Sequence, residues 1–247
     1  MTVEPVFGIH AVQAILEADV DRVEELLLLE GRGDSRIEKL RRLAENKRVQ
    51  ITQLSRKELD KIGPGVHQGV VARVRASIVQ DENALKKLVN DTQGPVTLLV
   101  LDGVTDPHNL GACLRTAEAA GVHAVIQPRD NSAGLTPVVR KVACGAAEIV
   151  PVIAVTNLAR TLRWLQQEGI WLVGADGEAE MCVDDCDMRG AIALIMGAEG
   201  RGMRRLTRDC CDFLVRIPMM GSLSSLNVSV SAGICLFEMV RQRKTAK

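Results

Sequence analysis

The chain has 247 residues, enough for one large domain or two smaller ones, and 47% of them are apolar, enough for a buried core. Its 31 basic residues balance its 31 acidic residues, so net charge favours no class of partner. With three Phe, two Trp and no Tyr, the composition excludes an RNA site built as an aromatic stacking platform.

The first part of the chain, residues 1–76, alternates between helical and strand patterns, which predicts a small α/β module. We expect helices at 7–18, 35–49 and 55–63, and strands at 23–31, 50–55 and 69–76.

Charge is unevenly distributed along this module. Residues 1–35 carry two basic and eight acidic side chains, whereas residues 36–75 carry eleven basic and four acidic ones. A basic half-domain suits a polyanion, although a solvated helix face would give the same pattern.

Residues 77–94 are polar and charged and end at Gly94, before Pro95. This composition predicts a linker with one loose helix, and a domain boundary inside it.

From residue 95 to 247 the alternation becomes regular. Continuous apolar runs separated by helical patterns indicate a parallel sheet covered on both faces. The expected strands are 96–104, 122–127, 148–155, 170–175, 191–197 and 212–218. The expected helices are 109–121, 136–147, 157–169, 203–211 and 225–243. On the last helix we expect one stripe against the sheet, formed by Leu226, Val230, Gly233, Phe237 and Val240. A second face of small residues, Ser229, Ser231, Ala232 and Gly233, would meet a partner.

Three motifs follow ends of these strands, where ligands bind in such sheets. They are LDGVTDPHNLGACLRTAEAAGVHAVI (101–126), ALIMGAEGRGM (193–203) and IPMMGSLSSLNVSVSAGICLFEMV (217–240). GAEGRG is not the GxGxxG pattern of a dinucleotide loop. The third motif, read alone, is a strand-to-helix turn capped by Ser225 or Asn227.

In this order and at these separations, the motifs resemble those of the SpoU-type (TrmH-like) RNA 2′-O-ribose methyltransferases of the SPOUT class. FGIHAVQAILE (7–17) and HQGVVARV (67–74) extend the resemblance to the bacterial enzymes that act on 23S ribosomal RNA. It implies an α/β fold with a deep trefoil knot over 95–247, and a module at 1–76 that resembles ribosomal protein L30 and binds RNA.

The implied reaction is methylation, from S-adenosylmethionine, of a guanosine ribose 2′-hydroxyl in 23S ribosomal RNA or its precursor, in the peptidyl-transferase region. The resemblance also implies a homodimer, and the reaction needs no metal. The alternatives are a tRNA ribose 2′-O-methyltransferase of the same class, or a non-catalytic RNA-binding protein with the same fold.

The resemblance assigns polar site residues one by one: Asn109, Arg115, Glu199, Ser225 and Asn227. Arg115 would be the general base in family proposals. Because arginine stays protonated, we favour a cation that stabilises the developing alkoxide. Taken alone, Arg115 would pair with Glu118 one helical turn on.

Asn109 also fits a helix cap, and Glu199 would orient Arg115 or Asn227. The resemblance places the cofactor at Gly197, Ile217, Met219 and Leu226, although Ile217 and Leu226 also suit an ordinary core.

The remaining features concern the compartment and metal ligands. Seven cysteines, an odd number, lie mostly in apolar runs, and Cys182 and Cys186 lack zinc-site spacing. The N-terminus lacks a signal-peptide pattern, and no apolar run reaches the roughly eighteen residues of a membrane span. We therefore expect a cytoplasmic protein with reduced thiols and no metal.

Overall fold

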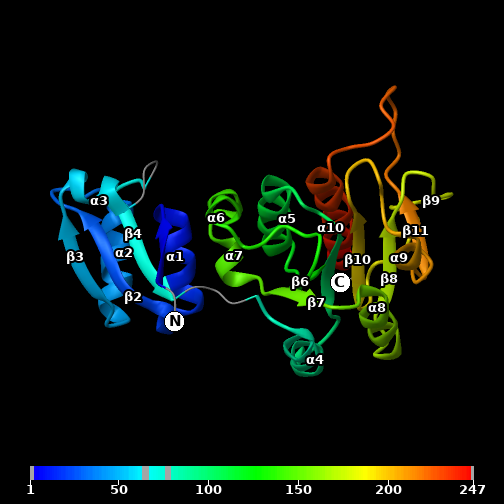
Figure 1. The fold of residues 1–247 in the computed structure, drawn as a ribbon, viewed down its shortest axis with the longest axis horizontal. Helices are drawn as coiled ribbons and strands as arrows, with labels where there is room; N and C mark the ends of the chain where they lie inside the picture. Colours follow the sequence, from blue (N-terminus) through cyan, green and yellow to red (C-terminus); the bar gives the residue numbers. More distant parts are fainter. Residues whose placement is uncertain (1–2, 63–66, 76–78, 246–247) are drawn as a thin grey trace. The chain divides into compact units, whose positions relative to one another are not determined.

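The computed structural model describes residues 3–62, 67–75 and 79–245 of the chain (Figure 1). The chain divides into two compact units, each with its own sheet. The first unit is Met1–Ile78 with Cys144–Ile149, and the second is Val79–Ala143 with Val150–Lys247. The end of the expected module at residue 76, and residues 77 and 78 of the expected linker, lie outside the described residues.

The first unit is built on a four-stranded sheet of order β1-β4-β2-β3. Its strands are β1 (Val3–Phe7), β2 (Val23–Leu29), β3 (Gln50–Leu54) and β4 (Val70–Arg75). Strand β4 pairs antiparallel with β1 and β2, and β2 pairs parallel with β3. The sequence patterns did not predict β1, which contains Pro5 and lies at a sheet edge, where proline is tolerated in strands.

Helices cover both faces of this sheet. They are α1 (Ile9–Ala18), α2 (Ser35–Asn46) and α3 (Arg56–Ile62), with a 3-10 turn η1 at Val20–Arg22. Leu26 and Leu28 pack with apolar residues of α1 and α2, whereas Leu27, which points the other way, packs with Leu59 of α3. Asp34 caps α2 by accepting hydrogen bonds from the next turn.

The second unit holds a seven-stranded sheet of order β7-β6-β5-β10-β8-β11-β9, in which every pairing is parallel, as the sequence predicted (Figure 1). The strands are β5 (Thr97–Asp102), β6 (Ala124–Pro128), β7 (Val152–Val155), β8 (Trp171–Ala175), β9 (Met181–Cys182), β10 (Ile192–Gly197) and β11 (Phe213–Arg216). The two-residue strand β9 was not predicted. Strand β7 begins later than expected because residues Ala146–Ile149 form a short helix, α7, which groups with the first unit.

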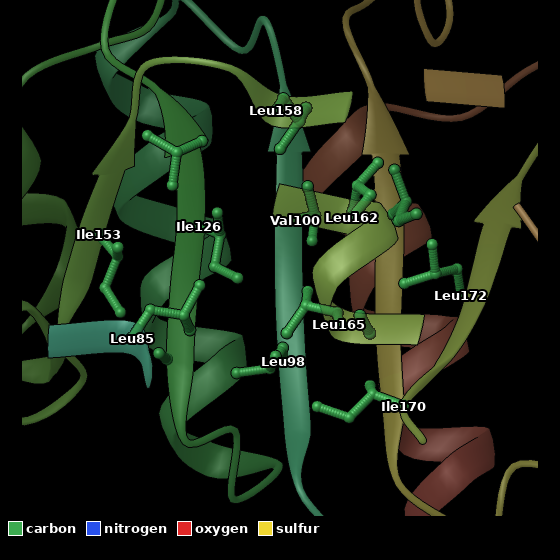
Figure 2. Packing of buried hydrophobic residues seen from close by; sticks show 14 of the residues in the cluster. Leu85, Leu98, Val100, Ile126, Ile153, Leu158, Leu162, Leu165, Ile170 and Leu172 are labelled. Atoms are coloured by element: carbon green, nitrogen blue, oxygen red, sulfur yellow. The ribbon is translucent and has the colours of Figure 1, made fainter. Parts of the chain in front are cut away.

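Helices also cover both faces of the second sheet. They are α4 (Glu82–Asp91), α5 (Pro107–Ala119), α6 (Pro137–Ala143), α8 (Leu158–Gln167), α9 (Arg205–Arg208) and α10 (Val228–Thr245). Figure 2 shows Leu162 and Leu165 of α8 beside Leu98 and Val100 of β5, in a cluster that includes Leu85 of α4. On β5, Leu99 and Leu101 alternate with these residues and are fully buried, so the opposite face is covered too.

The expected linker contributes to this sheet from Gln80 onward. Gln80 bridges to Ile153 of β7, Asp81 caps α4, and Leu85 is 1% exposed in the core. Helix α4 is therefore docked rather than loose, because Leu85 is buried and Leu88 and Val89 pack against the same core cluster.

Helix α10 packs against α5 and β10, but not by the face that the sequence suggested. Its buried residues are Val228, Ala232, Cys235, Leu236 and Met239. Two members of the expected stripe, Val230 and Phe237, instead face outward, and each is 49% exposed. The expected stripe was wrong. The helix carries apolar side chains on several sides, so their periodicity does not identify the face that is buried.

All seven cysteines are free thiols, and burial raises the pKa of Cys113 and Cys235 to about 12. Among the described residues, no helix is long and apolar enough to cross a membrane.

Candidate active site

The three motifs meet at one edge of the second sheet. The strands β5 and β10 are neighbours, β8 lies between β10 and β11, and all run parallel, so their carboxyl ends share that edge. The connection from β11 to α10, drawn in orange in Figure 1, extends beyond the ends of the strands. Each motif therefore supplies a loop to the same region.

Helix α5 begins at this edge and presents Asn109 in its first turn. Asp106 is the cap, since its carboxylate accepts from the backbone N–H of His108 at 3.0 Å, and Pro107 occupies the first turn. The capping role that Asn109 also fitted thus belongs to Asp106. Asn109 is buried, at 7% exposure, so its side-chain amide needs a hydrogen-bond partner.

That partner is Asn227, immediately before α10. The Asn227 side-chain oxygen Oδ1 caps α10, accepting from the Ser229 backbone N–H at 2.9 Å and its hydroxyl at 2.6 Å. The side-chain nitrogen Nδ2 then donates to Asn109 Oδ1 at 2.9 Å and to Glu199 Oε1 at 2.6 Å. The Asn227 amide therefore joins all three motifs. Arg115 and Asn227 were the two partners expected for Glu199, and the structure shows the hydrogen bond to Asn227.

Glu199 is carried by a tight turn after β10. Ala198 and Gly202 exchange backbone hydrogen bonds of 3.1 and 2.8 Å, and Gly200 and Gly202 have φ values of 75° and 68°. A Cβ on Gly197 would lie 2.1 Å from the Gly202 carbonyl carbon, so only glycine fits there. The turn's own backbone explains Gly197, and its expected contact with a cofactor stays a prediction.

Asp102, at the end of β5, is a residue of this region that sequence reasoning missed. Its carboxylate is fully buried and accepts from the backbone N–H of Arg204 at 2.8 Å and from its Nε at 2.6 Å. The available signal was an acidic residue closing a continuous apolar strand, because such a buried charge requires a partner.

Asp176, after β8, was missed in the same way. Its carboxylate accepts from Arg208 Nε at 2.7 Å, and this hydrogen bond lowers the pKa of Asp176. An ideal Cβ on the neighbouring Gly177 would lie 3.8 Å from the carbonyl oxygen of Ser224, so the loop after β8 borders the third motif.

The two other polar residues expected in the site, Arg115 and Ser225, are both exposed. Arg115 lies on α5, six residues after Asn109, and Ser225 lies in the loop before α10, two residues before Asn227. Each is thus carried by an element that also supplies a member of the amide cluster. Their expected roles in chemistry stay predictions.

The residues expected to hold the cofactor lie along the third motif. Ile217, Met219 and Leu226 are half-buried, and the backbone between them belongs to neither helix nor strand. Met220 is 97% exposed and Leu223 70% exposed. An adenine ring needs apolar walls and hydrogen-bonding groups. The apolar side chains, and the backbone N–H and C=O groups that no helix or strand uses, fit this requirement.

One group of candidate metal ligands exists within the described residues. Ligand atoms of Cys182, Asp184 and Asp185 lie within 4.8 Å of one another. Both aspartates are exposed, and surface acidic groups gather without an ion, so this group supports no metal site.

Comparison with known families gives two matches. The sequence model of the SpoU rRNA Methylase family matches residues 96–237. The model for RNA 2′-O ribose methyltransferase substrate binding matches residues 5–80.

Similar curated proteins span nearly the whole chain. A 23S rRNA (guanosine-2′-O-)-methyltransferase RlmB from Pseudomonas putida is 59% identical over 244 residues, covering 99% of this chain and 98% of the relative. The protein of the same name from Escherichia coli K12 is 57% identical over 241 residues, covering 97% and 99%.

Solved structures agree with these matches. The SpoU methyltransferase AviRb from Streptomyces viridochromogenes has a TM-score of 0.80 at 26% identity, covering 99% of this chain and 91% of that one. Its complex with the cofactor AdoMet has a TM-score of 0.78 at 27% identity, covering 98% and 90%.

Proposed function

Since this chain belongs to the SpoU rRNA methylase family, we propose that it transfers a methyl group from S-adenosylmethionine to the ribose 2′-hydroxyl of a guanosine in 23S ribosomal RNA. The observation that carries this proposal is the cluster in which Asn227 joins Asn109 and Glu199. Polar residues from three motifs meet at the ligand-binding edge of the sheet, in a chain 59% identical to an enzyme of that activity.

The cofactor supplies a methyl group already activated by its sulfonium. The half-buried side chains of Ile217, Met219 and Leu226 would hold its adenine ring, and Gly197 would border it. The protein then has two tasks: to bring the hydroxyl oxygen to about 3–3.5 Å from the methyl carbon in line, and to favour loss of the hydroxyl proton.

Arg115 performs the second task as a cation. A guanidinium keeps its proton at neutral pH, so it stabilises the developing alkoxide by charge and hydrogen bonds, and it can hold a neighbouring phosphate. The hydroxyl proton would pass to solvent, and S-adenosylhomocysteine would leave as the oxygen bonds to the methyl carbon. Its exposed position on α5 leaves it accessible to RNA.

The amide cluster performs the first task. Asn227 has its oxygen committed to the α10 cap and its nitrogen to two partners, so it cannot rotate without losing several bonds. Asn109 and Glu199 are thereby held where the ribose approaches, and Ser225 contributes a hydroxyl from the adjoining loop.

Residues 1–76 serve as the substrate-binding domain and residues 95–247 as the catalytic domain. The substrate-binding match over residues 5–80 supports the first assignment, together with the basic helix α2. On this helix Arg36, Lys39 and Arg42 are exposed, so they can meet RNA phosphates.

The catalytic domain would contain a deep trefoil knot. The chain leaves the sheet at β11, beyond β8, and α10 then returns to pack on α5 and β10. This return supports the proposal, because a knotted chain must bring its C-terminal part back to earlier segments.

We also assign the active unit as a homodimer. Val230, Ile234 and Phe237 form an exposed apolar stripe on α10, at helical spacing i, i+4 and i+7. A second copy of the chain, presenting the same stripe, would bury it in an isologous interface. We also propose that the protein is cytoplasmic, which a ribosomal RNA substrate and seven cysteines outside any disulfide support.

The test is methyl transfer to RNA. Purified protein with labelled S-adenosylmethionine should label 23S ribosomal RNA, and primer extension should map one 2′-O-methylguanosine that cells lacking the protein do not make. Labelling of tRNA alone would identify a tRNA methyltransferase instead. RNA binding without any labelling would identify a non-catalytic binding protein.

A further inference from the structure

Asp102 holds both ends of the turn that carries Glu199. At the first end, Gly197 of β10 pairs in register with Asp102 of β5. At the second end, the Asp102 carboxylate accepts from the backbone N–H of Arg204 at 2.8 Å and from its guanidinium Nε at 2.6 Å. Both ends of the segment from residue 197 to residue 204 are therefore held by the same buried residue, Asp102.

This ion pair is unusual in its burial. The Asp102 side chain is 0% exposed and that of Arg204 is 55% exposed, so the carboxylate relies on Arg204 for compensation of its charge. Burying a carboxylate is costly, and apolar residues fill a sheet edge at least as stably. What the ion pair adds is a defined position for the chain that follows β10.

The position of this segment determines the position of Glu199. Ala198 and Gly202 are hydrogen-bonded to each other, and Gly197 lies against the backbone of residues 202 and 203, so the turn moves as one body. At its tip, Glu199 Oε1 accepts from Asn227 Nδ2 at 2.6 Å. A displacement at Arg204 would therefore displace the Glu199 carboxylate from Asn227.

We propose that Arg204, held by the buried Asp102, is a positioning residue for methyl transfer, acting through Glu199. Its effect on catalysis rests on the function proposed above, whereas its effect on the turn does not. Arg204 hydrogen-bonds Asp102, whereas the side-chain nitrogen of Asn227 donates to Asn109 and Glu199. The contribution of Arg204 therefore passes through the turn.

The test compares Arg204→Ala, Arg204→Lys and a matched control, Arg205→Ala. Arg205 is adjacent, is 93% exposed and pairs only loosely with Asp209, at 3.7 Å. In single-turnover methylation, Arg204→Ala should be slower by about ten- to a hundredfold, the range expected when reacting groups are misplaced by an ångström or less. Arg204→Lys, which retains the charge without the two-pronged geometry, should fall in between, and Arg205→Ala should match the parent.

Two further readouts separate positioning from general destabilisation. The dissociation constant for S-adenosylmethionine should change less than about threefold, since Ile217, Met219 and Leu226 lie outside the turn and Gly197 stays paired with Asp102 in the sheet. In a Glu199→Ala background, Arg204→Ala should slow the reaction no further, because residues that act through one another are not additive. Equal slowing in both backgrounds would overturn the proposal.

Hydrogen exchange measures the turn without any chemistry. The amides of Ala198 and Gly202 are hydrogen-bonded across the turn, so Arg204→Ala should speed their exchange while Arg205→Ala leaves it unchanged. If Arg204→Ala exchanges faster but the parent labels no RNA, Arg204 does hold the turn in place and the proposed function is wrong. Unchanged exchange would refute the positioning role whatever the activity.

Discussion

The side-chain nitrogen of Asn227 donates to the side-chain oxygen of Asn109 over 2.9 Å, although the two residues are 118 positions apart. The orientation of the Asn227 amide follows from its other contacts. Its oxygen accepts from the Ser229 backbone N–H, which can only donate, so its nitrogen must face Asn109 and Glu199. The Asn227 side chain thus caps α10 and also joins the three motifs through Asn109 and Glu199.

Arg115→Ala should abolish turnover and leave S-adenosylmethionine binding unchanged. Loss of a cation that stabilises the alkoxide lowers the rate by about 10²–10³. Single-turnover methylation and equilibrium cofactor binding measure the two effects. Arg163→Ala, which removes an exposed arginine from α8, is the control. A rate within about threefold of the parent would remove Arg115 from the mechanism.

Asn227→Ala should reduce both stability and activity. Loss of the α10 cap alone lowers the free energy of unfolding by about 0.5–2 kcal/mol. Chemical denaturation measures this change. Asn227→Asp keeps the acceptor for the Ser229 N–H but places a second carboxylate against Glu199.

The two variants should therefore differ in their pH dependence. Two adjacent carboxylates repel each other, so the stability deficit of Asn227→Asp should be largest at neutral pH, where carboxyl side chains are normally ionised. As pH falls, one carboxyl binds a proton and the deficit shrinks. A deficit independent of pH would show that the two groups do not face each other.

Neutralising the exposed basic residues of α2 should weaken RNA binding and its dependence on salt. For the double change Arg36→Gln and Lys39→Gln, the slope of log affinity against log salt should fall by roughly 0.7 for each phosphate of single-stranded RNA that is no longer neutralised. Filter binding at several salt concentrations provides the slope. Arg163→Gln is the control, and an unchanged slope in the α2 variant would exclude this helix from the RNA interface.

Gly233 should tolerate alanine but not leucine. An ideal Cβ at Gly233 lies 3.5 Å from Thr116 Cγ2 of α5, an ordinary contact distance. Gly233→Ala should add up to about 1 kcal/mol through helix propensity. The longer side chain of Gly233→Leu must displace α5, at a cost of about 1–3 kcal/mol. Thermal unfolding of the pair tests this, and similar stabilities would contradict it.

Phe237→Asp should dissociate the homodimer. The charged side chain would lie in the stripe formed with Val230 and Ile234, where an obligate interface leaves no water to solvate it. Sedimentation should show a dimer for the parent and a monomer for the variant at low micromolar concentration. Trp171→Gln changes a similarly exposed apolar residue at the start of β8 and should leave the dimer intact. A monomeric parent with full activity would refute the assignment.

The sequence predicted the parallel sheet well because each of its long strands is an apolar run bounded by polar residues. It also predicted that the three motifs share one edge, since parallel strands align their carboxyl ends. The Asn109, Glu199 and Asn227 positions came from motif resemblance, and their meeting at a single amide followed from no spacing in the chain.

Other features could not be predicted from local pattern. Which face of α10 is buried depends on the shape of α5 and β10, and the helix is apolar on several sides. The docking of α4 rests on Leu85, Leu88 and Val89, whose spacing predicts a helix but does not identify the surface on which that helix packs. The role of Asp102 depends on Arg204, a partner 102 positions later.

The residue that joins the motifs comes last in chain order, and this has a consequence for biosynthesis. All seven strands of the second sheet are complete by Arg216, whereas Asn227 and α10 follow them. A nascent chain that has emerged only to residue 216 can pair its strands but has no amide to join Asn109 to Glu199. The amide cluster therefore forms only after residue 227 has been made, so a chain that ends at residue 216 should lack the joined site.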